Sequence, residues 1–586
     1  MASNGENRLS VSTTGKSRTP GPYDRKTRSE SVARATTYLG PSSNWSFHGR
    51  VLNLVHTHIR HTPFPSSDFL FEGEAYGLPW NDRRDSLDPG KALVPGIDHA
   101  TFLVNVVKFH CAQLFHLFEE EEFNARLQAF YSSTDDTTGT DLWYVHFLLV
   151  IALGKALAQN NHQAVRPSGS DLFQEVQQLL PDTDTLCRDP IVAMELLCCA
   201  ALYLHALDSR NAAHVTIGQA MRIGQANGMH TDMPVQDLGE TLVQRCRKIW
   251  WTVCLLDRQM TSLMGIPQSI RTYEITCQLP DFAESPHRRV ALDMQISLSH
   301  VYADIARYVY GPNQGLQKDF VASIKSVLNT LTRLAETLRT AFTLQTNRGM
   351  SRAAAHLHLQ HLQLVILVIR PILFCCLELL LLDPAEALHL TSLAKVHHLI
   401  TVCSEAAQNI LGILSSLQEQ GLLETFLPWD FDALFVSTTV LILIRSIDGT
   451  MPASRSDHLD DAFTLFEYMT ACGNDVAAHR IHELHALKNM LEGVTPASGL
   501  QLNRLEALGS AVPSRQQNVV SQHGPAGATA ELGTHNGGTA SVDIPTVVSD
   551  TGLDVRAEQI LAMTDAMDIE ETDWMGLLMF DPSCVV

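Results

Sequence analysis

The chain has 586 residues, of which 45% are apolar and 18% charged, a composition typical of a globular protein with more than one folded unit. It carries 42 Lys and Arg against 63 Asp and Glu, which gives a net charge of -21. This acidity excludes bulk attraction to a phosphate backbone, so any contact with nucleic acid needs a local basic patch or a partner.

The cysteine pattern predicts a reducing compartment. The 12 cysteines show no paired spacing, and most fall within apolar helical runs, where a free cysteine behaves as a small hydrophobic residue. The N-terminal sequence MASNGENRLSV contains no apolar signal segment. We therefore expect a cytosolic or nuclear location.

Residues 1–37 are polar and mildly basic, and we predict a disordered arm there. Residues 38–492 are predicted to form an all-α, multi-helix domain, because apolar residues recur with helical period and extended β-branched alternation is absent. The main apolar runs are 141–159, 189–207, 212–227, 242–264, 288–310, 317–344, 352–382, 392–417, 431–446 and 458–491. Residues 493–540 have the composition of a flexible linker.

One apolar run, residues 364–383, is long enough to cross a membrane. It contains Arg370, Pro371 and Glu378, and charged groups near a bilayer centre are costly. The sequence favours a buried pair of helices that is broken at the proline, and no contact with a membrane is expected.

The segment 242–267 contains the most informative pattern of the chain. On a helix, one stripe would carry Trp250, Val253, Cys254, Asp257 and Thr261. The adjacent Trp250 and Trp251 would point about 100° apart and pack against two neighbours. Asp257 on this apolar stripe needs a partner, and an arginine such as Arg247 or Arg258 is expected. Gly265 and Pro267 should end the helix.

Signatures of catalysis are absent from the sequence. We find no glycine-rich phosphate loop, no nucleophile elbow, and no zinc-protease motif, so no catalytic residue, metal ligand or cofactor is predicted. Histidines 356, 358 and 361 crowd one segment, and we expect surface or core histidines there rather than a metal site.

Several ordered motifs resemble the fungal-specific transcription factor domain, the regulatory middle region of zinc-cluster activators. The matching strings are Arg247-Lys248-Ile249-Trp250-Trp251, Leu255-Leu256-Asp257-Arg258, Gly265-Ile266-Pro267, Ala220-Met221-Arg222-Ile223-Gly224, Gly228-Met229-His230, Leu357-His358-Leu359, Arg370-Pro371 and Tyr38-Leu39-Gly40-Pro41-Ser42-Ser43. Gly224 and Met229 depart mildly from the family pattern, which has alanine and leucine there. The resemblance covers residues 38–490 and implies a helical regulatory domain of a nuclear transcription regulator.

The chain departs from this family in one respect. Members usually begin with a six-cysteine zinc cluster that binds DNA, whereas the first cysteine here is Cys111. Two explanations stay open: the protein natively lacks this module, or a segment that precedes Met1 supplies it. Which residues contact DNA is therefore unknown, and contact is expected through a missing module or a partner protein.

The C-terminal residues 541–586 interleave ten acidic residues with apolar ones. Acidic residues keep such a segment soluble while its aromatic and aliphatic side chains stay available to a coactivator groove. We predict an activation tail in which the contact residues are Trp574, Leu577, Leu578 and Phe580. An inert acidic tail that docks on the protein's own core is the alternative.

Two functional hypotheses follow. In the first, the protein regulates transcription: it forms a homodimer or binds a DNA-binding partner, and its tail recruits coactivators. Related regulators often control sugar catabolism or a specialised-metabolite gene cluster. In the second, it is a helical metabolite sensor or a corepressor that does not contact DNA.

Overall fold

The computed structural model describes residues 39–62, 64, 75–76, 94–132, 141–158, 167–282, 285–311, 318–346, 349–447 and 456–492. The predicted basic arm (1–37), linker (493–540) and acidic tail (541–586) lie outside the described residues.

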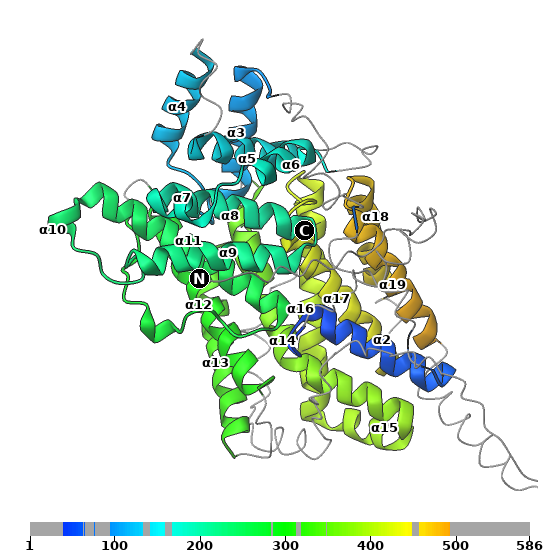
Figure 1. Cartoon of the computed structure of the whole chain (residues 1–586). Coiled ribbons are helices and arrows are strands. Elements are labelled where there is room, and N and C mark those ends of the chain that lie inside the picture. Colours follow the sequence, from blue (N-terminus) through cyan, green and yellow to red (C-terminus); the bar gives the residue numbers. More distant parts are fainter. Residues whose placement is uncertain are drawn as a thin grey trace, which may run out of the picture.

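The described residues are almost entirely helical, which confirms the predicted all-α class (Figure 1). A two-residue antiparallel pair, β1 (Gln345–Thr346) with β2 (Gly349–Met350), is the β structure among them. The helices in chain order are α2 (Asn44–Arg60), α3 (Ile97–Cys111), α4 (Glu120–Ser132), α5 (Leu142–Leu157), α6 (Ser170–Leu179), α7 (Thr183–Arg188), α8 (Pro190–Ala206), α9 (Arg210–Ala226), α10 (Val235–Leu238), α11 (Glu240–Met264), α12 (Pro286–Tyr308), α13 (Lys318–Ala341), α14 (Arg352–Leu382), α15 (Pro384–Ser392), α16 (Ala394–Glu419), α17 (Pro428–Ile447), α18 (Ser456–Ala471) and α19 (Asp475–Glu492), with a 3-10 turn at Thr272–Glu274.

The first half of the domain is built around α5, α8 and α11. Helix α5 contacts α3, α6 and α8, while α8 packs along α9, and α11 crosses both α8 and α9. Nearly every side chain of α5 and α8 is buried, because both helices are apolar on all faces. Figure 1 shows α3, α4, α5 and α6 gathered at one end of the molecule and α9 and α11 below them.

The second half is built around α14, which contacts α12, α13, α15, α16 and α17. The N-terminal helix α2 packs against α14 and α19, so the two ends of the described chain lie side by side (Figure 1). Aromatic contacts join the halves: the rings of Phe115 and Trp429 lie 5.4 Å apart, as do those of Tyr203 and Phe426. One continuous hydrophobic core results.

Most apolar runs became helices near their predicted positions, and one run divides into two helices. The run 458–491 breaks into α18 and α19 at Gly473, which has a φ of 91° that favours glycine. The run 392–417 lies in α16, whose N-terminus is preceded by the short α15. Helices α2, α6, α7 and α10 lie outside the predicted runs.

The predicted break at Pro371 is wrong, because α14 continues through the proline as one 31-residue helix. Among the described residues, α14 is the helix long and apolar enough to span a membrane, and its most apolar 18-residue window has a mean hydropathy of 2.6. However, 83% of this apolar window is buried inside the protein, as in the core helix of a soluble domain.

Candidate functional site

The predicted apolar stripe lies at the centre of α11 and is fully buried. Its members are each at most 1% exposed: Trp250, Val253, Cys254, Asp257 and Thr261. The helix ends at Met264, where Gly265 adopts a left-handed φ of 68° and caps the last turn. The predicted end of the helix at Gly265 and Pro267 is therefore confirmed.

The two adjacent tryptophans of α11 pack in different directions, as predicted. The ring of Trp250 lies against α9 at Gly224, where an added Cβ would come within 3.1 Å of it, and near His230, at 5.9 Å between ring centroids. Trp251 instead donates its indole N–H to the carbonyl of Gln278, at 3.1 Å. Glycine in place of the family's alanine at position 224 thus makes room for the ring.

The basic pair before the tryptophans anchors α11 to its surroundings. Arg247 binds Asp232 at 3.0 Å, and Lys248 lies 3.3 Å from Glu119. The side chain of Arg247 is 8% exposed, so it acts as a support of the fold and is not available to an external phosphate.

Asp257 is completely buried, and its hydrogen-bond partner is the hydroxyl of Ser269, at 2.7 Å. The expectation that an arginine pairs with this carboxylate is wrong. Arg258 turns to Ser299 at 2.9 Å and to Thr272 at 3.3 Å instead. Burial raises the pKa of Asp257 above its ordinary value, since the hydroxyl of Ser269 only partly compensates for the lost hydration.

The end of α11 meets the N-terminal segment 40–44 backbone to backbone. The amide of Gly40 donates to the carbonyl of Met264 at 2.8 Å. A Cβ on Gly40 would lie 1.8 Å from the carbonyl oxygen of Gly265, and a Cβ on Gly265 would lie 2.8 Å from the amide nitrogen of Ser43. Both positions require glycine, because no side chain fits such an approach.

Arg370 holds the same N-terminal segment from the other side. It is 1% exposed and donates from Nε to the Tyr310 hydroxyl at 2.8 Å, from Nη1 to Asn44 Oδ1 at 2.8 Å, and from Nη2 to the carbonyl of Ser42 at 2.5 Å. Its guanidinium also lies over the ring of Phe47, 4.8 Å from the centroid. Arg370 and Gly265, 105 positions apart in the sequence, therefore clamp one short segment.

Pro371 stays within α14 because its missing hydrogen bond is replaced. A proline removes the N–H that would reach the carbonyl four residues earlier, here that of Leu367. The hydroxyl of Tyr310 donates to this carbonyl at 2.7 Å, while it accepts from Arg370. The Arg370-Pro371 motif is thus completed by a tyrosine just beyond α12.

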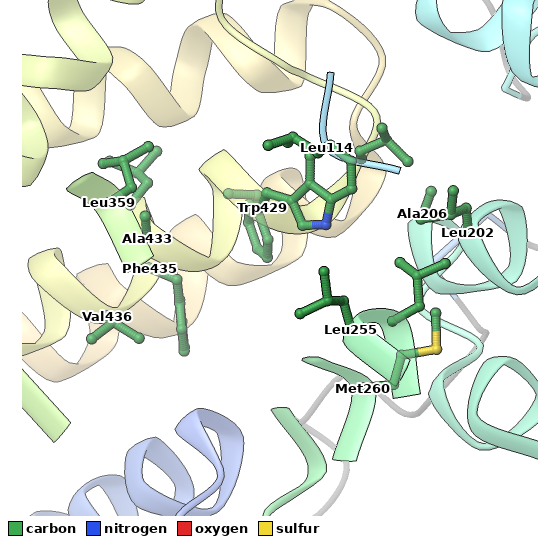
Figure 2. Packing of buried hydrophobic residues seen from close by; sticks show 14 of the residues in the cluster. Leu114, Leu202, Ala206, Leu255, Met260, Leu359, Trp429, Ala433, Phe435 and Val436 are labelled. Atoms are coloured by element: carbon green, nitrogen blue, oxygen red, sulfur yellow. The ribbon is translucent and has the colours of Figure 1, made fainter. Parts of the chain in front are cut away.

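A cavity lies between α11, α12, α14 and α17, next to the N-terminal segment. It offers about 120 Å³ to the centres of water-sized atoms. Figure 2 shows Leu255 of α11 and Leu359 of α14 on either side of Trp429 of α17, and all three residues line the cavity.

Several residues on the cavity wall have a polar side-chain atom without a hydrogen-bond partner. Within the part of the chain that the structure describes, the buried atoms without a hydrogen bond include Arg258 Nε, Gln295 Oε1, His356 Nε2, Gln360 Oε1 and Trp429 Nε1. Four of these side chains belong to residues at most 4% exposed, the exception being Gln360. Such groups are costly to bury without a partner.

The cavity wall is positively charged at neutral pH. Arg258 and Arg370 carry guanidinium groups. Burial, reinforced by the charge of Asp208, raises the pKa of the lining Asp432 to about 8, so this acid is mostly neutral at pH 7. Burial lowers the pKa of His356 to about 3, so its imidazole is neutral as well.

An ion-pair network near α8 was not anticipated from the sequence. Glu195, 1% exposed, accepts two hydrogen bonds from Arg245 at 3.1 Å each and lies 3.1 Å from His116 Nε2. Burial acts to raise the pKa of Glu195, but the bonds from His116 and Arg245 outweigh it and lower that pKa. The available signal was Glu195 itself, an acid inside the apolar run 189–207.

The crowded histidines of α14 are core residues. His358 Nε2 lies 2.8 Å from the carbonyl of Phe342, and His361 Nε2 lies 2.9 Å from that of Leu331. In the described ranges, no group of three His, Cys, Asp or Glu side chains is arranged to hold a metal ion. The predicted tail residues Trp574, Leu577, Leu578 and Phe580 lie outside the described residues.

Comparison with known proteins identifies a similar family of domains. Residues 102–338 match the family model described as the fungal specific transcription factor domain. This region is therefore similar to a fungal specific transcription factor domain, and the helical body that the structure describes extends beyond the match on both sides. No solved structure matches the chain.

The curated relatives are three uncharacterized transcriptional regulatory proteins of Schizosaccharomyces pombe. One is 20% identical over 476 residues, covering 78% of this chain and 57% of its own length. The second is 21% identical over 34% of this chain and 26% of its own length, and the third is 19% identical over 39% and 28%. The chain thus spans little more than half of the first relative's length.

Proposed function

We propose that this protein is a nuclear transcription regulator in which the helical domain controls the activity of an acidic activation tail. The match of residues 102–338 to a transcription factor domain carries the proposal, and the relatives named as transcriptional regulatory proteins support it. The gene targets would be those of a metabolic pathway or a specialised-metabolite cluster.

Direct contact with DNA is proposed to come from outside the described helical domain. The basic residues of the α11 signature are engaged: Arg247 with Asp232 and Lys248 with Glu119. With a net charge of -21 the whole chain would repel a phosphate backbone. A zinc cluster encoded upstream or a DNA-binding partner would then deliver the protein to promoters.

A reporter assay tests the activation tail. The full chain is fused to a heterologous DNA-binding domain, and Trp574, Leu577, Leu578 and Phe580 are replaced together by alanine. We expect the parent fusion to activate the reporter and the fourfold variant to lose that activity, because the apolar side chains make the coactivator contact. A matched control replaces Leu502, Leu505, Leu508 and Val512 of the linker and should retain activity. Equal activation by all three fusions would reject the tail's role.

The 5′ end of the transcript tests the route to DNA. An in-frame upstream segment with six suitably spaced cysteines would assign DNA binding to this protein itself. A start at Met1 would direct the search to a partner protein, to be identified by co-purification with the tagged chain from nuclei.

A metabolite sensor or corepressor without DNA contact is the second candidate. The cavity supports the sensor version, since a bound ligand could supply partners to the unbonded polar atoms of its lining residues.

A further inference from the structure

We propose that the cavity between α11, α12, α14 and α17 binds a small carboxylate metabolite that also carries hydrogen-bonding groups. The inference rests on the proposed function for its biological role, because the metabolite would be the signal to which the regulatory domain responds. Binding itself is a property of the folded protein and is measurable without DNA.

The size of the cavity limits the ligand. Its volume of about 120 Å³ is comparable to that of a cavity of roughly 150 Å³ that holds one benzene molecule, so the ligand must be a small molecule. This is the size of an amino acid or a hydroxy acid, and it is too small for a nucleotide. The apolar side of the wall, with Leu255, Leu359 and Val436, would enclose the carbon skeleton.

The unpartnered polar atoms define the ligand's functional groups. Arg258 of α11 and Trp429 of α17 line the cavity, and each has a buried N–H without an acceptor, which a carboxylate could supply. Gln295 and Gln360, from α12 and α14, each have an unpartnered amide oxygen within the described residues. A hydroxyl or ammonium group on the same molecule would donate to them.

Charge selects an anion over a neutral polyol. The guanidinium groups of Arg258 and Arg370 face the cavity, whereas Asp432, the acid on its wall, is mostly protonated at neutral pH. A single negative charge on the ligand therefore enters a positive, poorly solvated site, where electrostatic attraction is stronger than in water.

The position of the site connects binding to the fold. A molecule held by Arg258, Gln295, Gln360 and Trp429 would bridge four helices at once. Arg370 borders the same cavity and holds the N-terminal segment through Ser42 and Asn44. Occupancy should therefore stabilise the whole helical domain as well as the residues in contact.

The test uses the purified full chain with three probes: L-lactate, which carries a single negative charge, L-malate, which carries two, and myo-inositol as an uncharged control. We expect at least one of the two carboxylates, at millimolar concentration, to raise the melting temperature by a few degrees and to give saturable heat in calorimetry. Myo-inositol should have no effect. If neither carboxylate changes the melting temperature or gives heat, or if myo-inositol acts equally, the proposal is overturned.

Two variants separate binding from folding. Gln295→Leu and Gln360→Leu each remove an unpartnered buried amide, so without probe they should be as stable as the parent or more stable. Both should weaken probe binding at least tenfold. The control Gln178→Leu, on an exposed position of α6, should bind like the parent. If both cavity variants bind the probe as tightly as the parent does, the proposed binding site is wrong. The proposed transcriptional function would still be tested separately by the reporter assay.

Discussion

Trp250 occupies space that Gly224 leaves open, and the pair shows how α11 is fixed against α9. An alanine Cβ at position 224 would stand 2.8 Å from Cε of Met194 and 3.1 Å from the Trp250 ring. The thioether of Met194 could move, but a fully buried indole has little freedom to do so.

Replacing Trp250 by alanine should destabilise the domain by about 3–5 kcal/mol, the usual result of removing a large buried side chain. Urea unfolding followed by far-UV circular dichroism measures this loss. Phe102→Ala, at a position 55% exposed, serves as the control and should change the free energy of unfolding by less than about 1 kcal/mol. A Trp250→Ala protein with the parent's unfolding curve would contradict the role of this ring in the core.

Asp432 makes the stability depend on pH in a predictable direction. Its pKa is about 8 in the folded protein, while an unfolded aspartate titrates near 4. Between these values the unfolded chain releases the proton first, so stability falls as pH rises from about 4 to about 8. The stabilising contribution of the neutral acid is complete below the lower pKa and is lost above the higher one.

Asp432→Asn removes this titration. The free energy of unfolding of the variant minus that of the parent should therefore increase with pH, by on the order of 1 kcal/mol per pH unit. Unfolding of both proteins is compared at about pH 5 and about pH 8. A difference between them that is the same at both pH values would show that Asp432 is already ionised in the folded state.

At the scale of elements, α14 shows how a helix retains a proline in its core. The carbonyl of Leu367 would be left without its helical donor, but Tyr310 supplies a hydroxyl to it at 2.7 Å. Tyr310 thus supplies the hydrogen bond that Pro371 cannot make, although the two residues come from different helical regions.

A double-mutant cycle tests this pairing. Tyr310→Phe should cost about 1–3 kcal/mol, because the Leu367 carbonyl and Arg370 Nε both lose a partner. In a Pro371→Ala background the helix supplies its own N–H to that carbonyl, so the cost of Tyr310→Phe should fall. Equal costs in both backgrounds would mean that the hydroxyl does not compensate for the proline.

At the scale of the whole molecule, Arg370 links the N-terminal segment to the middle of the chain. Arg370→Lys keeps the charge but loses the forked geometry that reaches Ser42, Asn44 and Tyr310 together. Hydrogen exchange at the Gly40 amide, which donates to Met264, should accelerate about tenfold or more. Arg339→Lys on the exposed side of α13 should leave that exchange unchanged.

The sequence predicted the helical class, the buried stripe of α11 and the end of that helix, since these depend on local periodicity and on Gly265. It did not predict the partner of Asp257, because Ser269 lies beyond the helix end and is brought back by the turn after Gly265. The continuity of α14 escaped prediction for a similar reason: the donor that allows it, Tyr310, is 57 positions away from Leu367. The cavity depends on the meeting of four helices, which no local pattern specifies.

The clamp on residues 40–44 has a consequence for how the protein is made. Ser42 and Asn44 are synthesised more than 320 residues before Arg370. Their hydrogen bonds with Arg370 can therefore form only after most of the domain has been synthesised. The domain is then completed late and as one unit. A fragment cut at the boundaries of the family match, 102–338, would lack the N-terminal segment and all of α14 to α19, including Arg370. It would expose the surfaces of α11 and α12 that these missing parts cover in the full domain. The boundaries of sequence similarity are therefore not the boundaries of independent folding.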